Sequence, residues 1–180
     1  MKNKFRLIII LLKFTLLISN NVMSNEQFNF DITEIEILEN GNRFKGFKRG
    51  VITTNDGLLI EADEFDYNKI TNILDAQGNI KIFDKVSDLT IFTDSIRYFK
   101  KQESIFTLGN SKAFKEGTTI TANKFNYKKN INFLEAKENV KVDDSDQEIL
   151  IFAEEIAYEI NKELIYTKDF TRAIVEKKYN

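Results

Sequence analysis

Apolar and polar residues alternate along most of this 180-residue chain, and the alternation changes phase at regular places. Around residue 60, Ile60 and Ala62 occupy even positions, whereas Phe65 and Tyr67 occupy odd ones. A period of two is typical of a β-strand with one buried face, and one extra residue turns the rest of the strand to the other face. Both halves can face the same core only if the strand bulges or bends there. The pattern therefore predicts a long strand with a corner at Asp63-Glu64.

The same change of phase recurs in blocks of about thirty residues, which is typical of stacked supersecondary units that cannot bury their apolar faces alone. Tyr67, Tyr98, Tyr127 and Tyr158 close four of the kinked strands and lie 31, 29 and 31 residues apart. The other copies change phase between Phe30/Ile32 and Ile35/Ile37, Ile91/Thr93 and Ile96/Tyr98, Ile120/Ala122 and Phe125/Tyr127, and Ile151/Ala153 and Ile156/Tyr158.

A short polar link and a return strand follow each kinked strand, as in the link 68–72 and the alternating positions 74–82. Gly78 lies inside this return strand, where a positive φ would allow a further kink. Return strands with bulky residues alternate with strands of small residues, such as Thr107 and Ser111. The rows of small side chains either leave a space on one side of the core or relieve crowding where the sheets converge. The sequence pattern favours neither interpretation. Beyond the N-terminal segment the chain is predicted to be all-β.

The N-terminal segment has the order of a secretory signal peptide. Lys2, Lys4 and Arg6 precede an apolar run from Leu7 to Ile18, and small residues end at Ser24. About twelve apolar residues are too few for a transmembrane helix, which needs about 20. We expect residues 1–24 to be a signal peptide and residues 25–180 to form one domain. An uncleaved anchor and a buried core helix are the alternatives.

Charge and composition exclude several functions. Removal of residues 1–24 removes four cations, so the net charge falls from −2 to 22 − 28 = −6, which disfavours nucleic-acid binding. The chain has no cysteine and no histidine, so disulfides, thiolate metal sites and histidine-based catalysis are excluded. We expect a non-enzymatic protein without a metal or another cofactor.

The recurring string is best seen in Ile60-Glu-Ala-Asp-Glu-Phe-Asp-Tyr67 followed by Leu74-Asp-Ala-Gln-Gly-Asn-Ile-Lys-Ile-Phe-Asp84. This order resembles the OstA-like family of lipopolysaccharide-transport proteins over roughly residues 30–176. The Phe-x-Tyr form is more similar to the N-terminal domain of the outer-membrane translocon LptD than to the bridge protein LptA. The sequence departs from LptD in having no membrane barrel after Asn180 and no cysteines. It is therefore either a fragment of a longer protein or a stand-alone domain.

The resemblance implies an open β-jellyroll of two facing antiparallel sheets that holds the acyl chains of lipopolysaccharide between them. It also implies a periplasmic location at the outer membrane, and strand pairing at both ends with other Lpt-type jellyroll modules and the outer-membrane translocon. The most regular apolar rows supply the candidate groove residues, which otherwise form an ordinary sealed core. They are Ile60, Ile80, Ile82, Ile91, Ile120, Val140, Val142 and Ile151. The four tyrosines are predicted to form a structural cross-strand stack.

Three weaker interpretations remain. The acidic run 143–148 resembles a calcium loop but lacks the glycine and distant glutamate of an EF-hand, so a turn between blocks is favoured. The acidic pairs Asp63-Glu64 and Glu154-Glu155 could belong to a carbohydrate-cleaving enzyme, although a repeated pair indicates a corner rather than a single catalytic site. A self-associating β-solenoid without lipid cargo is the alternative to transport.

Overall fold

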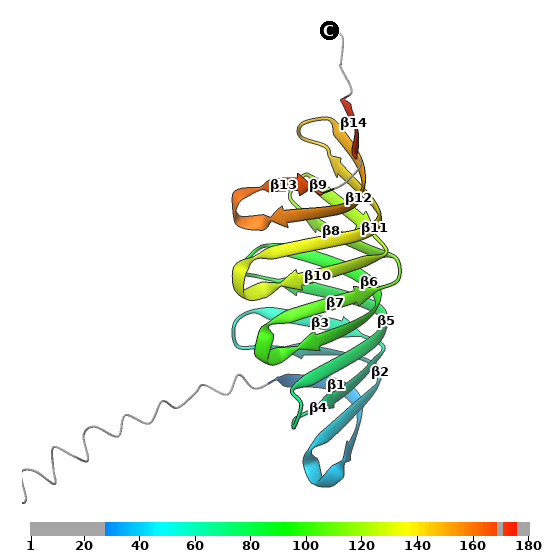
Figure 1. Ribbon diagram of the computed structural model, residues 1–180. Helices are drawn as coiled ribbons and strands as arrows, with labels where there is room; N and C mark the ends of the chain where they lie inside the picture. Colours follow the sequence, from blue (N-terminus) through cyan, green and yellow to red (C-terminus); the bar gives the residue numbers. More distant parts are fainter. Residues whose placement is uncertain (1–27, 169–170, 176–180) are drawn as a thin grey trace, which may run out of the picture.

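The computed structural model describes residues 28–168 and 171–175, which form fourteen antiparallel strands joined by short turns (Figure 1). The described part contains no α-helix, which confirms the all-β prediction. Six strands have ten to twelve residues. They are β1 (Asn29–Leu38), β2 (Arg43–Thr53), β5 (Ile73–Asp84), β6 (Leu89–Phe99), β11 (Phe133–Asp144) and β12 (Ile149–Glu159).

The other eight strands are short and occur in consecutive pairs along the chain. They are β3 (Leu58–Ala62), β4 (Glu64–Asn68), β7 (Ser104–Leu108), β8 (Ser111–Lys115), β9 (Thr118–Ala122), β10 (Lys124–Lys128), β13 (Leu164–Thr167) and β14 (Thr171–Val175). Single 3₁₀ turns at Glu39–Gly41, Lys100–Gln102, Lys129–Ile131 and Ile160–Lys162 connect some of the strands.

The strands form two facing sheets that are joined along one side. Each long strand bends midway and belongs to both sheets, whereas each short strand belongs to one. Sheet I contains β4, β7, β10 and β13 between the long-strand halves, and sheet II contains β3, β8, β9 and β14. Figure 1 shows the strands stacked from β1 at one end to β13 and β14 at the other. This is the predicted β-jellyroll.

The bends lie where the alternation changes phase, so the predicted corners are confirmed. Pairing of β5 with β6 shifts between Gln77 and Ile80, and pairing of β11 with β12 shifts between Lys137 and Val140. Two residues at such a corner oppose one on the neighbouring strand, as in a β-bulge. Gly78 and Asn79 form one of these pairs, with φ of 81° and 45°. A left-handed backbone conformation therefore turns β5 from one sheet into the other, and the corners of β2 and β11 have it as well.

Side chains reinforce the corner around Asp63, which lies between β3 and β4. Its backbone N–H donates to the Gly78 carbonyl at 3.0 Å. Its carboxylate accepts hydrogen bonds from Arg49 at 3.1 Å and from the Asn79 amide at 2.7 Å. A Cβ at Gly78 would lie 2.6 Å from an Asp63 carboxylate oxygen, so the corner requires glycine there.

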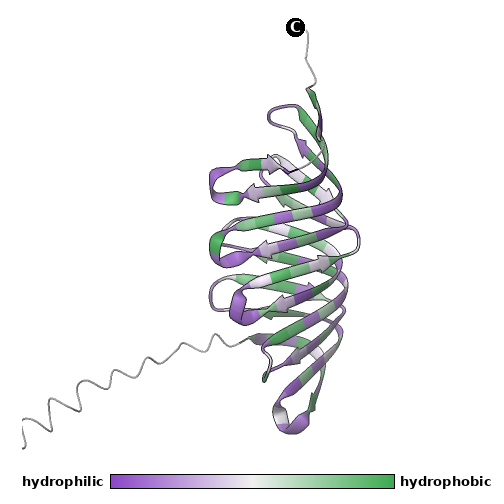
Figure 2. Cartoon of the chain, in the orientation of Figure 1, coloured by the Kyte–Doolittle hydropathy of each residue, from purple (hydrophilic) through white to green (hydrophobic). Residues whose placement is uncertain are grey.

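The hydrophobic core lies between the two sheets. Hydrophobic and hydrophilic positions alternate along the strands (Figure 2), and the inward-facing set is almost completely buried in the middle of the stack. The row of small residues is filled rather than hollow. Thr93, Thr107 and Ser111 are buried, and the Ser111 hydroxyl lies 3.0 Å from that of Thr93 and 2.6 Å from that of Thr107. Small side chains here allow the hydroxyl groups to satisfy one another inside the core.

Candidate functional site

The interior between the sheets contains an unbroken row of inward-facing side chains along sheet II. Strand register joins one residue from each strand into this row. Ten positions span nine strand spacings of about 4.8 Å, or about 43 Å. In order they are Phe30, Ile52, Ile60, Ile82, Ile91, Ala113, Ile120, Val142, Ile151 and Ala173.

All eight candidate groove residues face the interior from sheet II. Six of them belong to the row just described, and Ile80 and Val140 lie one step closer to the corners. Seven of the eight side chains are buried to 2% exposure or less, and Ile151 is half-buried near the end of the stack. The structure brings these residues together as one apolar strip that is covered by sheet I in this conformation.

Sheet I presents a second inward-facing row, in which tyrosines alternate with aliphatic residues. Leu74 lies between Tyr67 and Tyr98 in the strand register, and Leu134 lies between Tyr127 and Tyr158. The predicted direct stack of tyrosines is therefore wrong, because consecutive tyrosines are two strands apart. Phe28 packs against two of them, with ring centroids 4.8 Å from Tyr67 and 5.9 Å from Tyr98.

The interior is accessible at the ends of the stack. Ile35 and Ile37 on β1 face inward, since they pair with Gly46 and Phe44, yet they are 44% and 61% exposed. At the opposite end, Thr167 and Ala173 continue the inner rows and are also exposed. An apolar end that is open to solvent is a common feature of a binding surface.

The side of the molecule opposite the corners, where the two sheets are not joined by strands, is called the mouth here. Polar side chains connect the two sheets along it. We call this group the mouth latch and define it as Asp56, Asp84, Ser87, Tyr127 and Lys129. The Tyr127 hydroxyl of sheet I donates to the Asp84 carboxylate of sheet II at 2.7 Å and lies 3.0 Å from the Ser87 hydroxyl. Lys129 donates to Asp56, which also accepts from Thr54. The latch connects the tips of strands that belong to different sheets.

Burial and charge pairing set the electrostatics of the latch. Burial raises the pKa of the Tyr127 hydroxyl, and the neighbouring Asp84 charge adds to the effect, so Tyr127 stays protonated and donates. Burial is the largest influence on Lys129 and disfavours its charge, but the hydrogen bond to Asp56 and the nearby carboxylate charges together outweigh burial and raise the Lys129 pKa. Burial is likewise the largest influence on Asp56 and opposes its charge, but the hydrogen bonds from Lys129 and Thr54 and the Lys129 charge together outweigh burial and lower the Asp56 pKa. Both ions are therefore charged at neutral pH.

The latch was not among the residues predicted from sequence, although a signal for it exists. Asp84 has the same parity as Ile80 and Ile82, so it continues the inner face of β5 with a carboxylate. It is 1% exposed. A carboxylate at an apolar position requires a partner, which the tyrosine at the end of β10 supplies.

Two other sequence signals have structural explanations. The acidic run 143–148 forms the turn between β11 and β12, and the Asp144 carboxylate accepts from the backbone N–H groups of Asp146 and Gln147 at 3.1 and 2.9 Å. Within residues 28–168 and 171–175, no group of acidic side chains is arranged to hold a metal ion. No helix in the same residues has the length and apolarity needed to cross a bilayer. The predicted signal peptide lies outside the described residues.

Comparison with known proteins supports the fold independently. No family model and no curated protein matches the sequence. Among solved structures, the chain is similar to LptH of Pseudomonas aeruginosa, the LptA-homologous periplasmic component of a lipopolysaccharide-transport device, with a TM-score of 0.60. Sequence identity is 10%, and the similarity covers 68% of this chain and 96% of LptH. The chain thus has the β-jellyroll fold of an LptA-like protein.

Proposed function

We propose that this protein is a periplasmic lipopolysaccharide-transport module of the OstA-like family, related to LptA or to the N-terminal domain of LptD. Residues 25–180 form the transport domain, and residues 1–24 direct it to the periplasm. The protein holds acyl chains between its two sheets and performs no catalysis. The observation that carries the proposal is the apolar row that runs through the whole stack in an LptA-like fold.

The energetics of lipid transfer favour such a row. Exposure of each acyl CH₂ to water costs about 0.8 kcal/mol, so a chain of about twelve carbons costs on the order of 9 kcal/mol. A lipid with several chains cannot cross an aqueous compartment at a useful rate without a continuous apolar surface. The candidate groove residues and the exposed Ile35 and Ile37 supply such a surface from the interior to the end of the stack.

Strand pairing at the ends would extend the row into neighbouring modules. In the described residues, β1 pairs only with β2, and β13 and β14 pair only with β12, so each end has a free strand edge. Free edges are templates for addition of another strand, and the chain contains no proline to block them. Other Lpt-type modules and the outer-membrane translocon are the proposed partners.

Site-specific photo-crosslinking in the native cell envelope tests the proposal. A photoreactive residue is placed at Ile82, at Val142 and at the open-end position Ile37, with Lys81 as a control because it lies beside Ile82 but on the outer face. Lipopolysaccharide adducts at the three inward positions and none at Lys81 are expected. Adducts at Ile37 alone would contradict passage between the sheets.

The sealed middle of the core favours one alternative, a self-associating β-solenoid without lipid cargo. Absence of adducts at every inward position, with normal secretion and folding, would favour this alternative. The solenoid also predicts long polymers of the purified protein, whereas the transport module predicts limited end-to-end association that coexists with lipid binding. Light scattering of the purified protein distinguishes the two.

A further inference from the structure

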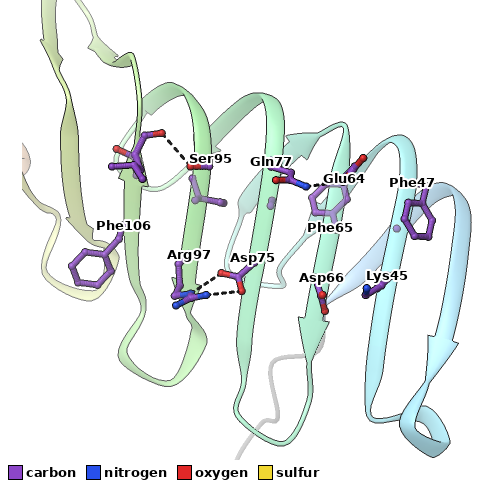
Figure 3. Close-up of a pocket in the computed structure, with 15 residues that line it drawn as sticks. Lys45, Phe47, Glu64, Phe65, Asp66, Asp75, Gln77, Ser95, Arg97 and Phe106 are labelled. Carbon is purple, nitrogen blue, oxygen red and sulfur yellow. Dashed lines mark hydrogen bonds and ion pairs between the residues drawn. The ribbon is translucent and has the colours of Figure 1, made fainter.

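The outer face of sheet I contains a second hollow that the transport function does not use. We call it the outer cleft. It has a volume of about 490 Å³ and crosses β2, β4, β5, β6 and β7 (Figure 3). Its principal lining residues are Lys45, Phe47, Asp66, Asp75, Arg97 and Phe106. These side chains point away from the core, so the cleft is separated from the interior by the thickness of the sheet.

Aromatic side chains mark the two ends of the cleft. Phe47 on β2 and Phe106 on β7 are 37% and 43% exposed, and Figure 3 shows them on opposite sides of the polar floor. Four strand spacings separate their strands, or about 19 Å. Ser95 keeps the hollow open because its small side chain lies in register between Gln77 and Leu108. The cleft is therefore an elongated channel with an apolar ring at each end.

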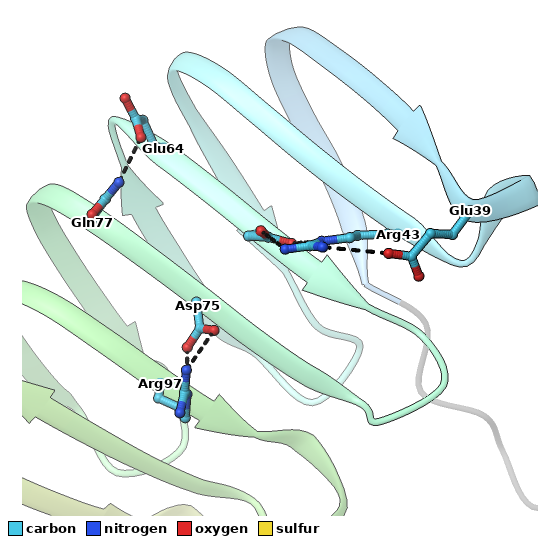
Figure 4. Close-up of polar contacts among 7 residues, drawn as sticks. Glu39, Arg43, Glu64, Asp75, Gln77 and Arg97 are labelled. Atoms are coloured by element: carbon cyan, nitrogen blue, oxygen red, sulfur yellow. Dashed lines mark hydrogen bonds and ion pairs between the residues drawn. The ribbon is translucent and has the colours of Figure 1, made fainter.

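The floor of the cleft consists of flat, fixed polar groups (Figure 4). Arg97 donates two hydrogen bonds of 2.7 and 3.0 Å to Asp75. Asp66 accepts two hydrogen bonds of 2.8 and 2.7 Å from Arg43, which lines the adjoining hollow rather than the cleft itself. Gln77 donates to Glu64 at 2.7 Å. A bidentate pair uses only part of the five guanidinium donors and part of the carboxylate lone pairs, so the rest can bond a ligand.

The charge of the cleft selects against ionic ligands. Lys45, Arg97, Glu64, Asp66 and Asp75 line the cleft, and Arg43 of the adjoining hollow pairs with Asp66. Counted together with Arg43, the charges in and beside the cleft balance. A polyanion or a polycation would gain no long-range attraction here. The cleft instead has closely spaced hydrogen-bond donors and acceptors between two phenylalanine rings. This arrangement matches a neutral oligosaccharide, which is a chain of sugar rings rich in hydroxyl groups. Sugar rings present hydroxyl groups at their edges and C–H groups on their faces, which suits fixed polar pairs and exposed phenylalanines, respectively.

The same geometry excludes cleavage of such a ligand. Hydrolysis of a glycosidic bond needs one carboxylic acid that remains protonated beside a second carboxylate. Asp66 and Asp75 lie opposite each other on β4 and β5, but each is held by an arginine. The hydrogen bond from Arg43 lowers the pKa of Asp66, so Asp66 does not supply the acid.

We propose that the outer cleft binds a neutral oligosaccharide without cleaving it, with Phe47 and Phe106 packing against sugar rings and the Arg97–Asp75 and Arg43–Asp66 pairs bonding hydroxyl groups. The sugar is either a free glycan or the neutral outer chain of a glycolipid. Because the cleft lies on the outer face, it would bind sugar whether or not the interior binds lipid.

Nuclear magnetic resonance titration of the exported protein, purified from the periplasm, tests this site. The probes are maltohexaose, cellohexaose and chitohexaose, together with neutral O-polysaccharide released from lipopolysaccharide by mild acid. Each is added up to about 10 mM, which detects weak single-site binding. Amide shifts confined to β2 and β4–β7 are expected. Binding of a hexasaccharide indicates a free glycan, and binding of the released polysaccharide alone indicates a glycolipid chain.

Variants separate the cleft from non-specific contact. Phe106→Ala and Phe47→Ala should each weaken binding about tenfold, since aromatic contacts dominate small polar sites. Phe114→Ala is the matched control, because Phe114 is 45% exposed on the outer face of sheet II. Equal loss in all three variants, retained binding in both cleft variants, or no shift with any probe would overturn the proposal.

Discussion

The mouth latch makes a measurable contribution to stability, and Tyr127→Phe isolates it. The substitution removes one hydroxyl that donates to Asp84 and contacts Ser87, and it leaves the ring in place. Asp84 retains the backbone N–H of Val86 at 2.9 Å, so it loses one donor rather than all of them. A hydrogen bond to a charged group contributes about 1.5–3 kcal/mol. We expect the free energy of unfolding to fall by about 2 kcal/mol, equivalent to about a 30-fold larger unfolded fraction.

Tyr67→Phe provides a matched control, because Tyr67 occupies the equivalent position one double repeat earlier in the chain. Its hydroxyl donates only to the neutral side chain of Asn72, at 3.5 Å. A bond of this length contributes little, so the control should lose less than about 0.5 kcal/mol. Urea unfolding followed by circular dichroism measures both variants under the same conditions.

Hydrogen exchange shows whether the latch also holds the mouth closed. In Tyr127→Phe, backbone amides of the turns 85–88 and 129–132 should exchange faster, whereas those at the corners should not change. Equal stability loss in the two tyrosine variants, or unchanged exchange at these turns, would refute a latch made by the Tyr127 hydroxyl.

Three further predictions test the core, a corner and the charged half of the latch. Ile82→Ala should lower the free energy of unfolding by about 3 kcal/mol in urea, because it opens a cavity in a fully buried row; a loss below about 1 kcal/mol would contradict the packing described. Gly78→Ala should cost at least about 1 kcal/mol more than Gly41→Ala. Both glycines have positive φ, but only at Gly78 does an added Cβ meet another atom within 3 Å, so equal losses would argue against the corner geometry. Lys129→Met should remove a pH-dependent part of stability. The pKa of Asp56 lies below its ordinary 3.8, so its contribution is present above that value and is lost as pH falls through the lowered pKa. The pKa of Lys129 lies above 10.5, so its contribution is present below that value and is lost as pH rises through the raised pKa. The stability difference between wild type and Lys129→Met should shrink at both extremes, and a constant difference from about pH 3 to pH 11 would contradict the ion pair.

The corners could be predicted from sequence because the alternation reports directly which side of a strand is buried. A change of phase at Asp63 has only one geometric solution if Ile60 and Tyr67 share a core, namely a bend. The row of groove candidates follows from the same reasoning, since parity places Ile60, Ile82 and Ile91 on one face. Parity alone does not give the strand register, so it predicts a stack of tyrosines that Leu74, Ile105 and Leu134 in fact separate.

The latch could not be predicted from sequence, because its partners are brought together only by the facing of the two sheets. Tyr127 and Asp84 are 43 residues apart and lie on different sheets. The alternation of apolar and polar residues shows that both side chains point inward. It does not show which strand end of one sheet lies opposite which strand end of the other. The outer cleft could not be predicted for a related reason, since its lining residues come from five strands and only the strand pairing brings them together.

The shared corners give the two directions of the molecule different mechanical properties. Every long strand is continuous from one sheet to the other, so sliding the sheets past each other along the stack would break ladder hydrogen bonds in both. Rotation about the line of corners leaves the ladders within each sheet intact, and it is resisted by the core side chains between the sheets and by the mouth latch. The jellyroll is therefore stiffer along its length than across its width. For the proposed transport module, this would allow acyl chains of different bulk to enter between the sheets while the distance between the two ends of the stack stays constant.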